Sequence, residues 1–231
     1  MGTILASTVI GKAQIILQDT TGVRWPSDTE LLGWLNDGQR EVMVFKPNAN
    51  VKNIAIKLAG GTKQALPTDG VQLIDVVRNM GTDGQTPGRA IRIVMREILD
   101  AQVPDWHSST PNATTKHYMY SVLDPKNFYV YPPQPASNQG YAELVYGAVP
   151  ADATINGAIS IDDIYQNVLI DYILYRAYSK DTEYAADEGR AGKHQAAYIA
   201  SLTGKAKAEI GVNPNATAPA NPNVLSTAAG G

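Results

Sequence analysis

The sequence predicts an α+β protein: a discontinuous four-helix bundle with an inserted antiparallel β-rich domain and an extended C-terminal arm. First, apolar side chains recur every three or four residues over residues 3–17 and 27–46, as on amphipathic helices. Second, the period changes to two from about residue 51. Third, the helical period returns over residues 161–210. The four helices can therefore share one core only if the chain returns to it after the β-rich segment.

The second helix has a start, a stop and one unusual position. Ser27 followed by Glu30 predicts a capping box at its beginning, and Pro47 predicts its end. Gly38 lies on the apolar stripe, where glycine costs about 1 kcal/mol relative to alanine in an exposed helix. We therefore expect Gly38 to allow the close approach of a neighbouring helix.

The β-rich segment is divided by turn residues. Gly60 and Gly61 predict a two-residue hairpin turn after the first strand, which contains Ile54 and Ile56. Three prolines predict a loop without regular strand pairing: Pro132, Pro133 and Pro135. A helical turn is expected at residues 96–101. Further strands are expected at residues 71–79, 89–95, 115–122, 127–131 and 141–149.

The third long helix is apolar on nearly every side from Ile164 to Tyr178, so we expect the other three helices to surround it. The fourth helix is expected from Asp187 to Ile210. The predicted domain boundaries follow from these elements. They place the first half of the bundle at residues 1–50, the inserted β domain at 51–160, the second half of the bundle at 161–211 and the arm at 212–231.

Composition and charge disfavour several classes of protein. Lys and Arg number 19 and Asp and Glu 22, a net charge of −3, which argues against tight nucleic-acid binding. The chain has no cysteine, which excludes disulfides and thiolate metal sites. With no secretory leader and no apolar run near 18 residues, we expect a soluble protein made in a cytoplasm, without a membrane partner.

The chain shows no pattern for catalytic, cofactor-binding or metal-ligating residues, so we expect none and no enzyme activity. The three histidines, His107, His117 and His194, lack metal-site spacing. A carbohydrate-binding or carbohydrate-cleaving protein stays an alternative, because tyrosines gather in the β-rich segment: Tyr118, Tyr120, Tyr129, Tyr131, Tyr141 and Tyr146. Cleavage would need two facing carboxylates. No spacing selects a pair among the candidates Asp75, Asp100, Asp105 and Glu143.

The last twenty residues carry no charge and cannot build a core. Ordering their backbone costs on the order of 20 to 40 kcal/mol, so we expect another polypeptide to bind them. The candidate partner-binding residues are Val212, Pro214, Asn215, Pro219, Pro222, Val224 and Leu225.

Three stretches resemble the head-to-tail adaptor family of tailed bacteriophages, which includes connector and tail tubular subunits. They are LLGWLNDGQREVMVFKP (31–47), QALPTDGVQLIDVVRN (64–79) and YRAYSKDTEYAADEGRAGKHQAAYIASL (175–202). The resemblance implies a structural virion protein of the neck or tail, made in the host bacterial cytoplasm. It implies a ring of usually twelve copies between the portal protein and a tail or nozzle protein, with extended termini that clasp the portal or a neighbour.

The resemblance further implies a channel that passes DNA without specific binding, and it transfers no catalytic residue. Two alternatives stay open beside it. One is a carbohydrate-binding or carbohydrate-cleaving tail component, and the other is a different neck or capsid-joining protein.

Overall fold

The computed structural model describes residues 2–181 and 185–212, and their side chains up to residue 204, apart from those of residues 185–187. It contains five α-helices and two β-sheets, which confirms the α+β class. The chain divides into two compact units. The β unit is Pro47–Asp152 with Gly2 and Ser160–Asp162, and the helical unit is Thr3–Lys46, Ala153–Ile159 and the described residues from Asp163 onward. None of the described helices is long and apolar enough to span a membrane.

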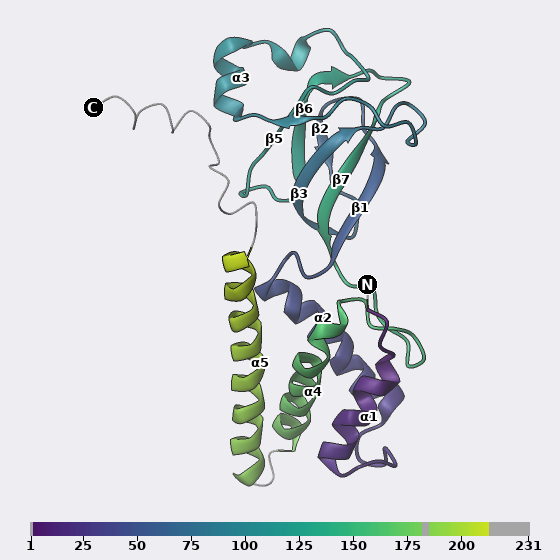
Figure 1. The fold of residues 1–231 in the computed structure, drawn as a ribbon, viewed down its shortest axis with the longest axis vertical. Coiled ribbons are helices and arrows are strands. Elements are labelled where there is room, and N and C mark those ends of the chain that lie inside the picture. The colour runs from purple at the N-terminus through teal and green to yellow at the C-terminus, as the bar shows by residue number, and fades with distance from the viewer. Residues whose placement is uncertain (1, 182–184, 213–231) are drawn as a thin grey trace, which may run out of the picture. The chain divides into compact units, whose positions relative to one another are not determined.

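In the helical unit, α4 contacts the three other long helices (Figure 1). The four are α1 (Ala6–Leu17), α2 (Leu32–Phe45), α4 (Gln166–Lys180) and α5 (Ala185–Val212). The buried side chains of α4 lie on most of its circumference and include Leu169, Ile173 and Leu174. This broad burial is what the apolar pattern of residues 164–178 predicts.

Gly38 confirms the expected close approach of a neighbouring helix. A Cβ atom at Gly38 would lie 2.9 Å from Cδ1 of Tyr172 and 3.2 Å from Cδ2 of Leu169, both on α4. Only glycine lets α2 and α4 approach this closely without moving those side chains.

The predicted capping box at Ser27 is wrong. Ser27–Leu31 forms one π-helical turn, in which the Leu31 amide donates to the carbonyl of Pro26. Pro26 rather than Ser27 is at the N-cap position, and it has no side chain that could accept the first amides. The Glu30 carboxylate bonds to Lys180 instead of returning to the backbone of its own helix.

The β unit contains two sheets with a core between them. The three-stranded sheet has the order β1 (Val51–Lys57), β7 (Tyr141–Ala148) and β3 (Gly70–Asn79). The four-stranded sheet has the order β2 (Gly61–Ala65), β6 (Asn127–Gln134), β5 (His117–Tyr120) and β4 (Arg92–Ile93). Side chains from both sheets fill the core, among them Leu73, Val76, Phe128, Val130, Leu144 and Tyr146.

The second face of the four-stranded sheet is covered by α3 (Arg96–Gln102) and the short helix Trp106–Ser108. Leu99 and Trp106 pack there on Met119, with Tyr129 and Tyr131 at the edge of the cluster. Strand β6 therefore buries Phe128 and Val130 on one face and places Tyr129 and Tyr131 on the other, as the period of two requires. The expected helical turn after residue 95 is confirmed as α3.

The predicted hairpin at Gly60 and Gly61 is wrong, because β1 and β2 belong to different sheets. Strand β1 pairs with β7 and β2 pairs with β6. Gly61 does have a positive φ of 90°, which only glycine adopts without strain, but it turns the chain around a corner between sheets. Turn chemistry alone does not distinguish a hairpin from such a corner.

Two further strand predictions are corrected. The prolines do not interrupt pairing. Strand β6 continues through Pro132 and Pro133, because its neighbours bond to backbone carbonyl groups there and need no amide from proline. The backbone amide of Lys116 donates to the carbonyl of Tyr131, and the backbone amide of Asn112 donates to that of Pro133. Of the strand expected at residues 89–95, only Arg92–Ile93 is regular, and it pairs parallel with β5. Its preceding residues bond to β3 instead, so the segment is divided between both sheets.

Candidate interaction surfaces

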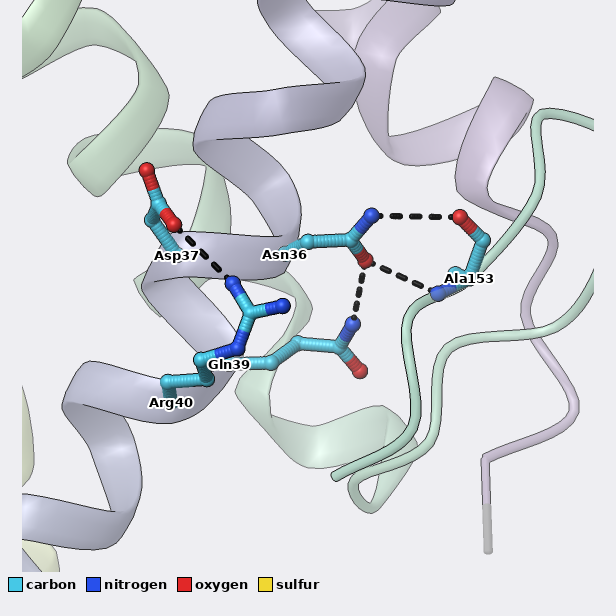
Figure 2. Close-up of polar contacts among 5 residues, drawn as sticks. All are labelled: Asn36, Asp37, Gln39, Arg40 and Ala153. Carbon is cyan, nitrogen blue, oxygen red and sulfur yellow. Dashed lines mark hydrogen bonds and ion pairs between the residues drawn. The ribbon is translucent and has the colours of Figure 1, made fainter. Parts of the chain in front are cut away.

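Helix α2, which lies in the stretch 31–47 that resembles the adaptor family, forms polar contacts with a segment far away in the sequence. The Asn36 carboxamide donates to the carbonyl of Ala153 at 3.2 Å and accepts from the Ala153 amide at 2.9 Å (Figure 2). The fully buried Gln39 donates to Oδ1 of Asn36 at 3.0 Å. Asp37 and Arg40 bond to each other at 3.0 Å on another side of the helix (Figure 2). These residues therefore join elements within the helical unit.

The same distant segment supplies the missing cap of α1. Leu5 is at the N-cap position and offers no side-chain acceptor, so the Ala6 and Ser7 amides donate to the carbonyls of Gly157 and Ile155. Asp163 accepts from the Thr3 amide at 2.7 Å and the Ile4 amide at 2.9 Å. The Thr3 hydroxyl, followed by the Ile4 amide, lowers the pKa of Asp163. Its carboxylate thus anchors the residues that precede α1.

The tyrosines of the β unit do not form an open platform for sugars. Tyr118 and Tyr146 are buried, and their hydroxyls donate to Asp75 at 2.9 Å and to Asp69 at 3.2 Å. Burial, with the Asp69 carboxylate nearby, raises the pKa of Tyr146 to about 12. Burial, with Asp75 nearby, raises the pKa of Tyr118 further. The other four, Tyr120, Tyr129, Tyr131 and Tyr141, are half-buried.

Three of the four candidate carboxylates bond to other groups. Asp75 accepts from the Tyr118 hydroxyl, and Asp100 accepts from the Trp106 ring at 2.7 Å. Glu143 pairs with Arg78 at 2.5 Å, and this bond, followed by one from Asn53, lowers the pKa of Glu143. Asp105 is exposed and begins the short helix Trp106–Ser108. The structure therefore does not bring any two of the four into one hydrogen-bonded pair among the described residues.

The histidines also have separate partners. His107 lies 2.8 Å from the Thr62 hydroxyl and stacks on Trp106, and His194 lies 2.9 Å from Asp171. His117 stacks on Tyr131. Within the part of the chain that the structure describes, no group of three His, Cys, Asp or Glu could hold a metal ion.

Five exposed apolar side chains of the β unit form what we call the apolar ridge: Ile93, Met95, Ile98, Val122 and Leu123. Ile93 is 64% exposed, Met95 69% and Leu123 93%. β4 pairs with β5, and Arg96, Tyr120 and Asp124 line one small pocket, so the start of α3 lies beside the turn at residues 121–126. Hydrogen bonds within this turn fix its conformation: the Asp124 amide donates to Ser121 and the Asn127 amide to Asp124.

Three cations adjoin the apolar ridge, and we call them the basic cluster: Arg89, Arg92 and Lys116. Arg92 pairs in register with His117, the neighbour of Lys116. Burial, followed by the charges of the basic cluster, lowers the pKa of His117. None of the three side chains forms an ion pair among the described residues, whereas Arg96 pairs with Asp100. Sequence reasoning missed both features, although Ile91-Arg92-Ile93 already mixes apolar and basic side chains.

The predicted partner-binding residues fall at the end of the described chain. Val212 is the last residue of α5, so its assignment to an extended arm is wrong; the helix continues past the expected stop at Gly211. Pro214, Asn215, Pro219, Pro222, Val224 and Leu225 lie outside the described residues.

The fold and its junctions define the class first: an α+β protein in which a helical unit is interrupted by a β unit, with exposed apolar and basic surfaces. The family model described as SU10 adaptor protein matches residues 5–222. The chain therefore belongs to the SU10 adaptor protein family, a family of phage head-to-tail adaptors, and the resemblance found in the sequence is confirmed. A search of curated proteins found no match.

Proposed function

We propose that this chain is a ring-forming head-to-tail adaptor of a tailed bacteriophage, which connects the portal protein to a tail or nozzle protein in the neck of the virion. The observation that carries the proposal is the family match, because residues 5–222 include both units and all described helices and strands. A structural adaptor of the virion needs surfaces that bind other polypeptides, and the exposed side chains of the apolar ridge support the proposal because such patches are typical of protein–protein contacts.

In this proposal the ring contains twelve copies and encloses the channel through which DNA passes. The net charge of −3 supports it, because a lining rich in Lys and Arg would retain the duplex through the release of counterions. A neutral or mildly acidic lining lets the DNA move.

The proposed organisation keeps the predicted domains, with a four-helix bundle made from residues 1–50 and 161–211 and a β domain inserted at residues 51–160. The division of contacts into a helical and a β unit supports it. A fragment of residues 47–152 is expected to unfold cooperatively when produced alone, which circular dichroism during thermal unfolding would measure.

Residues 213–231 are proposed to bind the portal. A chain ending at Val212 should keep the circular dichroism spectrum of the full chain and lose its complex with the portal ring, measured by native mass spectrometry. The control is a full-length chain with residues 213–231 in scrambled order, which keeps the length and composition. Undiminished portal binding by the truncated chain would contradict this role.

The carbohydrate alternative gains no support, since the tyrosines are buried or half-buried and three of the four candidate carboxylates have other partners.

A further inference from the structure

We propose that the apolar ridge and basic cluster of one copy bind the exposed face of α2 of a second copy. This face, which we call the α2 face, consists of Asp37, Glu41, Val44 and Phe45. The inference rests on the proposed ring and names the two surfaces that would build it.

The apolar ridge calls for a protein partner. Phosphate backbones are bound through cations and hydrogen-bond donors and cover little apolar surface. Here five apolar side chains protrude beside the cations, and Leu123 is 93% exposed at the tip of a hydrogen-bonded turn. Contiguous exposed apolar side chains with a polar rim are typical of protein–protein contacts. DNA binding by the basic cluster is therefore the less favoured alternative.

The basic cluster specifies the charge of the partner. Two other cations of the β unit have carboxylate partners: Lys52 pairs with Asp69 at 2.6 Å and Arg78 with Glu143 at 2.5 Å. Arg89, Arg92 and Lys116 have none among the described residues. A partner that places carboxylates around an apolar centre would neutralise them and complement the ridge.

The chain itself carries such a surface on α2. Val44 is 73% exposed and Phe45 41%. Residues 37, 41 and 44 follow the helical steps of four and three, so they lie along one side of α2. Glu41 forms no ion pair among the described residues, and Asp37 is shared only with Arg40, which leaves this face net acidic.

Phe45 is held in place, since its ring meets that of Tyr198 on α5 edge-on at 6.2 Å. The α2 face is thus apolar, acidic and anchored to the helix beside it.

Two different faces of one chain that complement each other produce a head-to-tail contact, and such contacts close into rings when the rotation permits. A second copy satisfies both requirements at once: it offers the α2 face to the ridge and leaves its own ridge for the next copy. Burial of the basic cluster at this contact also removes three cations from the surface exposed to DNA.

The test reverses the charges of each face. The ridge variant is R89E/R92E, and the α2 variant is D37K/E41K. Each alone places like charges opposite one another and should weaken self-association roughly 100-fold. Mixed in equal amounts, the two variants should assemble again, because the reversed ridge faces the reversed α2 face and the native ridge faces the native one.

Matched controls carry the same change of charge elsewhere on the surface. They are K57E/K63E in the β unit and D28K/E188K in the helical unit, and both should assemble like the natural chain. Sedimentation velocity, with and without the portal ring, measures assembly. Circular dichroism and thermal unfolding verify that every variant is folded.

A second measurement uses the absence of cysteine from the natural sequence. Chains with M95C and chains with V44C, mixed in equal amounts under oxidising conditions, should form a disulfide-linked heterodimer well in excess of the share of about one half that random pairing gives. A heterodimer share of about one half, which random pairing of equal amounts gives, would overturn the inference even where the charge variants are poorly folded.

The outcomes separate this inference from the proposed function. A natural chain that forms rings, with both reversed variants assembling equally well, overturns the pairing of these faces and leaves the adaptor ring standing. Duplex binding that is lost only in R89E/R92E, with assembly unchanged, assigns the basic cluster to DNA and also overturns it. A natural chain that forms no oligomer, alone or with the portal, overturns both.

Discussion

The two units treat buried polar groups differently. Among the described residues, the helical unit buries a single carboxamide, that of Gln39, whereas the β unit buries four, those of Asn50, Gln64, Asn79 and Gln134. The reason is that a helix bonds its own backbone groups internally. Strands that change sheet leave amides and carbonyls without a ladder partner, and a buried group of this kind must find one elsewhere.

Several carboxamides satisfy this need by bonding both backbone groups of one residue, as a neighbouring strand would. Gln64 accepts from the Ala59 amide at 2.6 Å and donates to the Ala59 carbonyl at 2.8 Å. Asn79 does the same with Thr115, at 2.7 and 2.8 Å. In the helical unit Asn36 bonds Ala153 in this way, and Ala153 lies in a segment outside the helices and strands. Whether a carboxamide bonds both backbone groups of one residue therefore depends on the local backbone geometry of that residue and not on the unit.

The largest expected effect comes from removing the carboxamide of Asn79. Asn79→Ala leaves the Thr115 amide and carbonyl without their partners in a buried site. The Arg89 carbonyl, to which Nδ2 also donates at 2.8 Å, keeps the Asn79 amide as a donor. We expect a loss of about 4 kcal/mol in the free energy of unfolding, since each such group costs about 1 to 3 kcal/mol. Asn36→Ala should cost about 2 kcal/mol, because that site is only partly buried. Urea unfolding measures both.

Asn53→Ala is the control for these two variants. Asn53 is exposed on strand β1, and within the described part of the chain its side chain bonds to Glu143 alone, at 3.0 Å, so its loss should stay within about 0.5 kcal/mol. Equal losses for Asn79→Ala and Asn53→Ala would show that burial does not set the cost.

The two units also differ in what packs against a glycine: a backbone segment in the β unit and a side chain in the helical unit. A Cβ atom at Gly140 in the β unit would collide with the carbonyl oxygen of Ala113, which belongs to the backbone. At Gly38 it would meet the Tyr172 ring at 2.9 Å, and a side chain can move. We expect Gly140→Ala to cost about 3 kcal/mol and Gly38→Ala about 1 kcal/mol, in part because alanine favours the helix. Thermal unfolding measures the difference.

Gly11→Ala on α1 tests the helical contribution alone, because nothing lies within 4 Å of the added Cβ. It should stabilise the chain by about 0.5 to 1 kcal/mol. If Gly38→Ala proved as costly as Gly140→Ala, α4 would be as rigid as backbone at that point.

The same contrast explains what could be predicted from the sequence. Periodicity predicts the long helices and the α+β class, and the position of Gly38 predicts a close helix contact, because these depend on neighbours three or four residues apart. The partners of β1 and β2 are not predictable in this way. Their bonds run to β7 and β6, some 90 and 70 residues away along the chain, and local turn chemistry is compatible with a hairpin as well as a corner.

The candidate surfaces follow the same division. The resemblance in residues 31–47 correctly indicates the family, but Asn36 and Gln39 prove to be junction residues whose partner lies in another segment. The exposure of Ile93 and Met95 depends on which side of β4 is left uncovered. Strand β4 has only two regular residues, too few for an alternating pattern that would predict this side. The turn at residues 81–84 depends more on its neighbours in the chain, because the Asp83 carboxylate bonds to Gln85 and Thr86.

That turn yields the smallest expected effect, which is seen in the pH dependence of stability. Oδ1 of Asp83 accepts from the Gln85 and Thr86 amides at 3.0 Å each, and Oδ2 accepts from the Thr86 hydroxyl at 2.7 Å. The Gln85 amide, followed by the Thr86 hydroxyl and amide, lowers the pKa of Asp83 from 3.8 to about 2. A lowered pKa means that the ionised carboxylate stabilises the folded chain above about pH 4, and that this contribution disappears as the pH falls through 2.

Asp83→Asn removes the titrating group, so its melting temperature should lie below that of the natural chain at pH 5 and converge with it towards pH 2. Thr86→Val keeps both amide bonds and removes only the hydroxyl, so its convergence should be partial. Differential scanning calorimetry between pH 5 and 2 measures the three curves. A constant gap between the natural chain and Asp83→Asn would mean that the amides do not hold the carboxylate in its ionised form, and that this turn is fixed by its glycines alone.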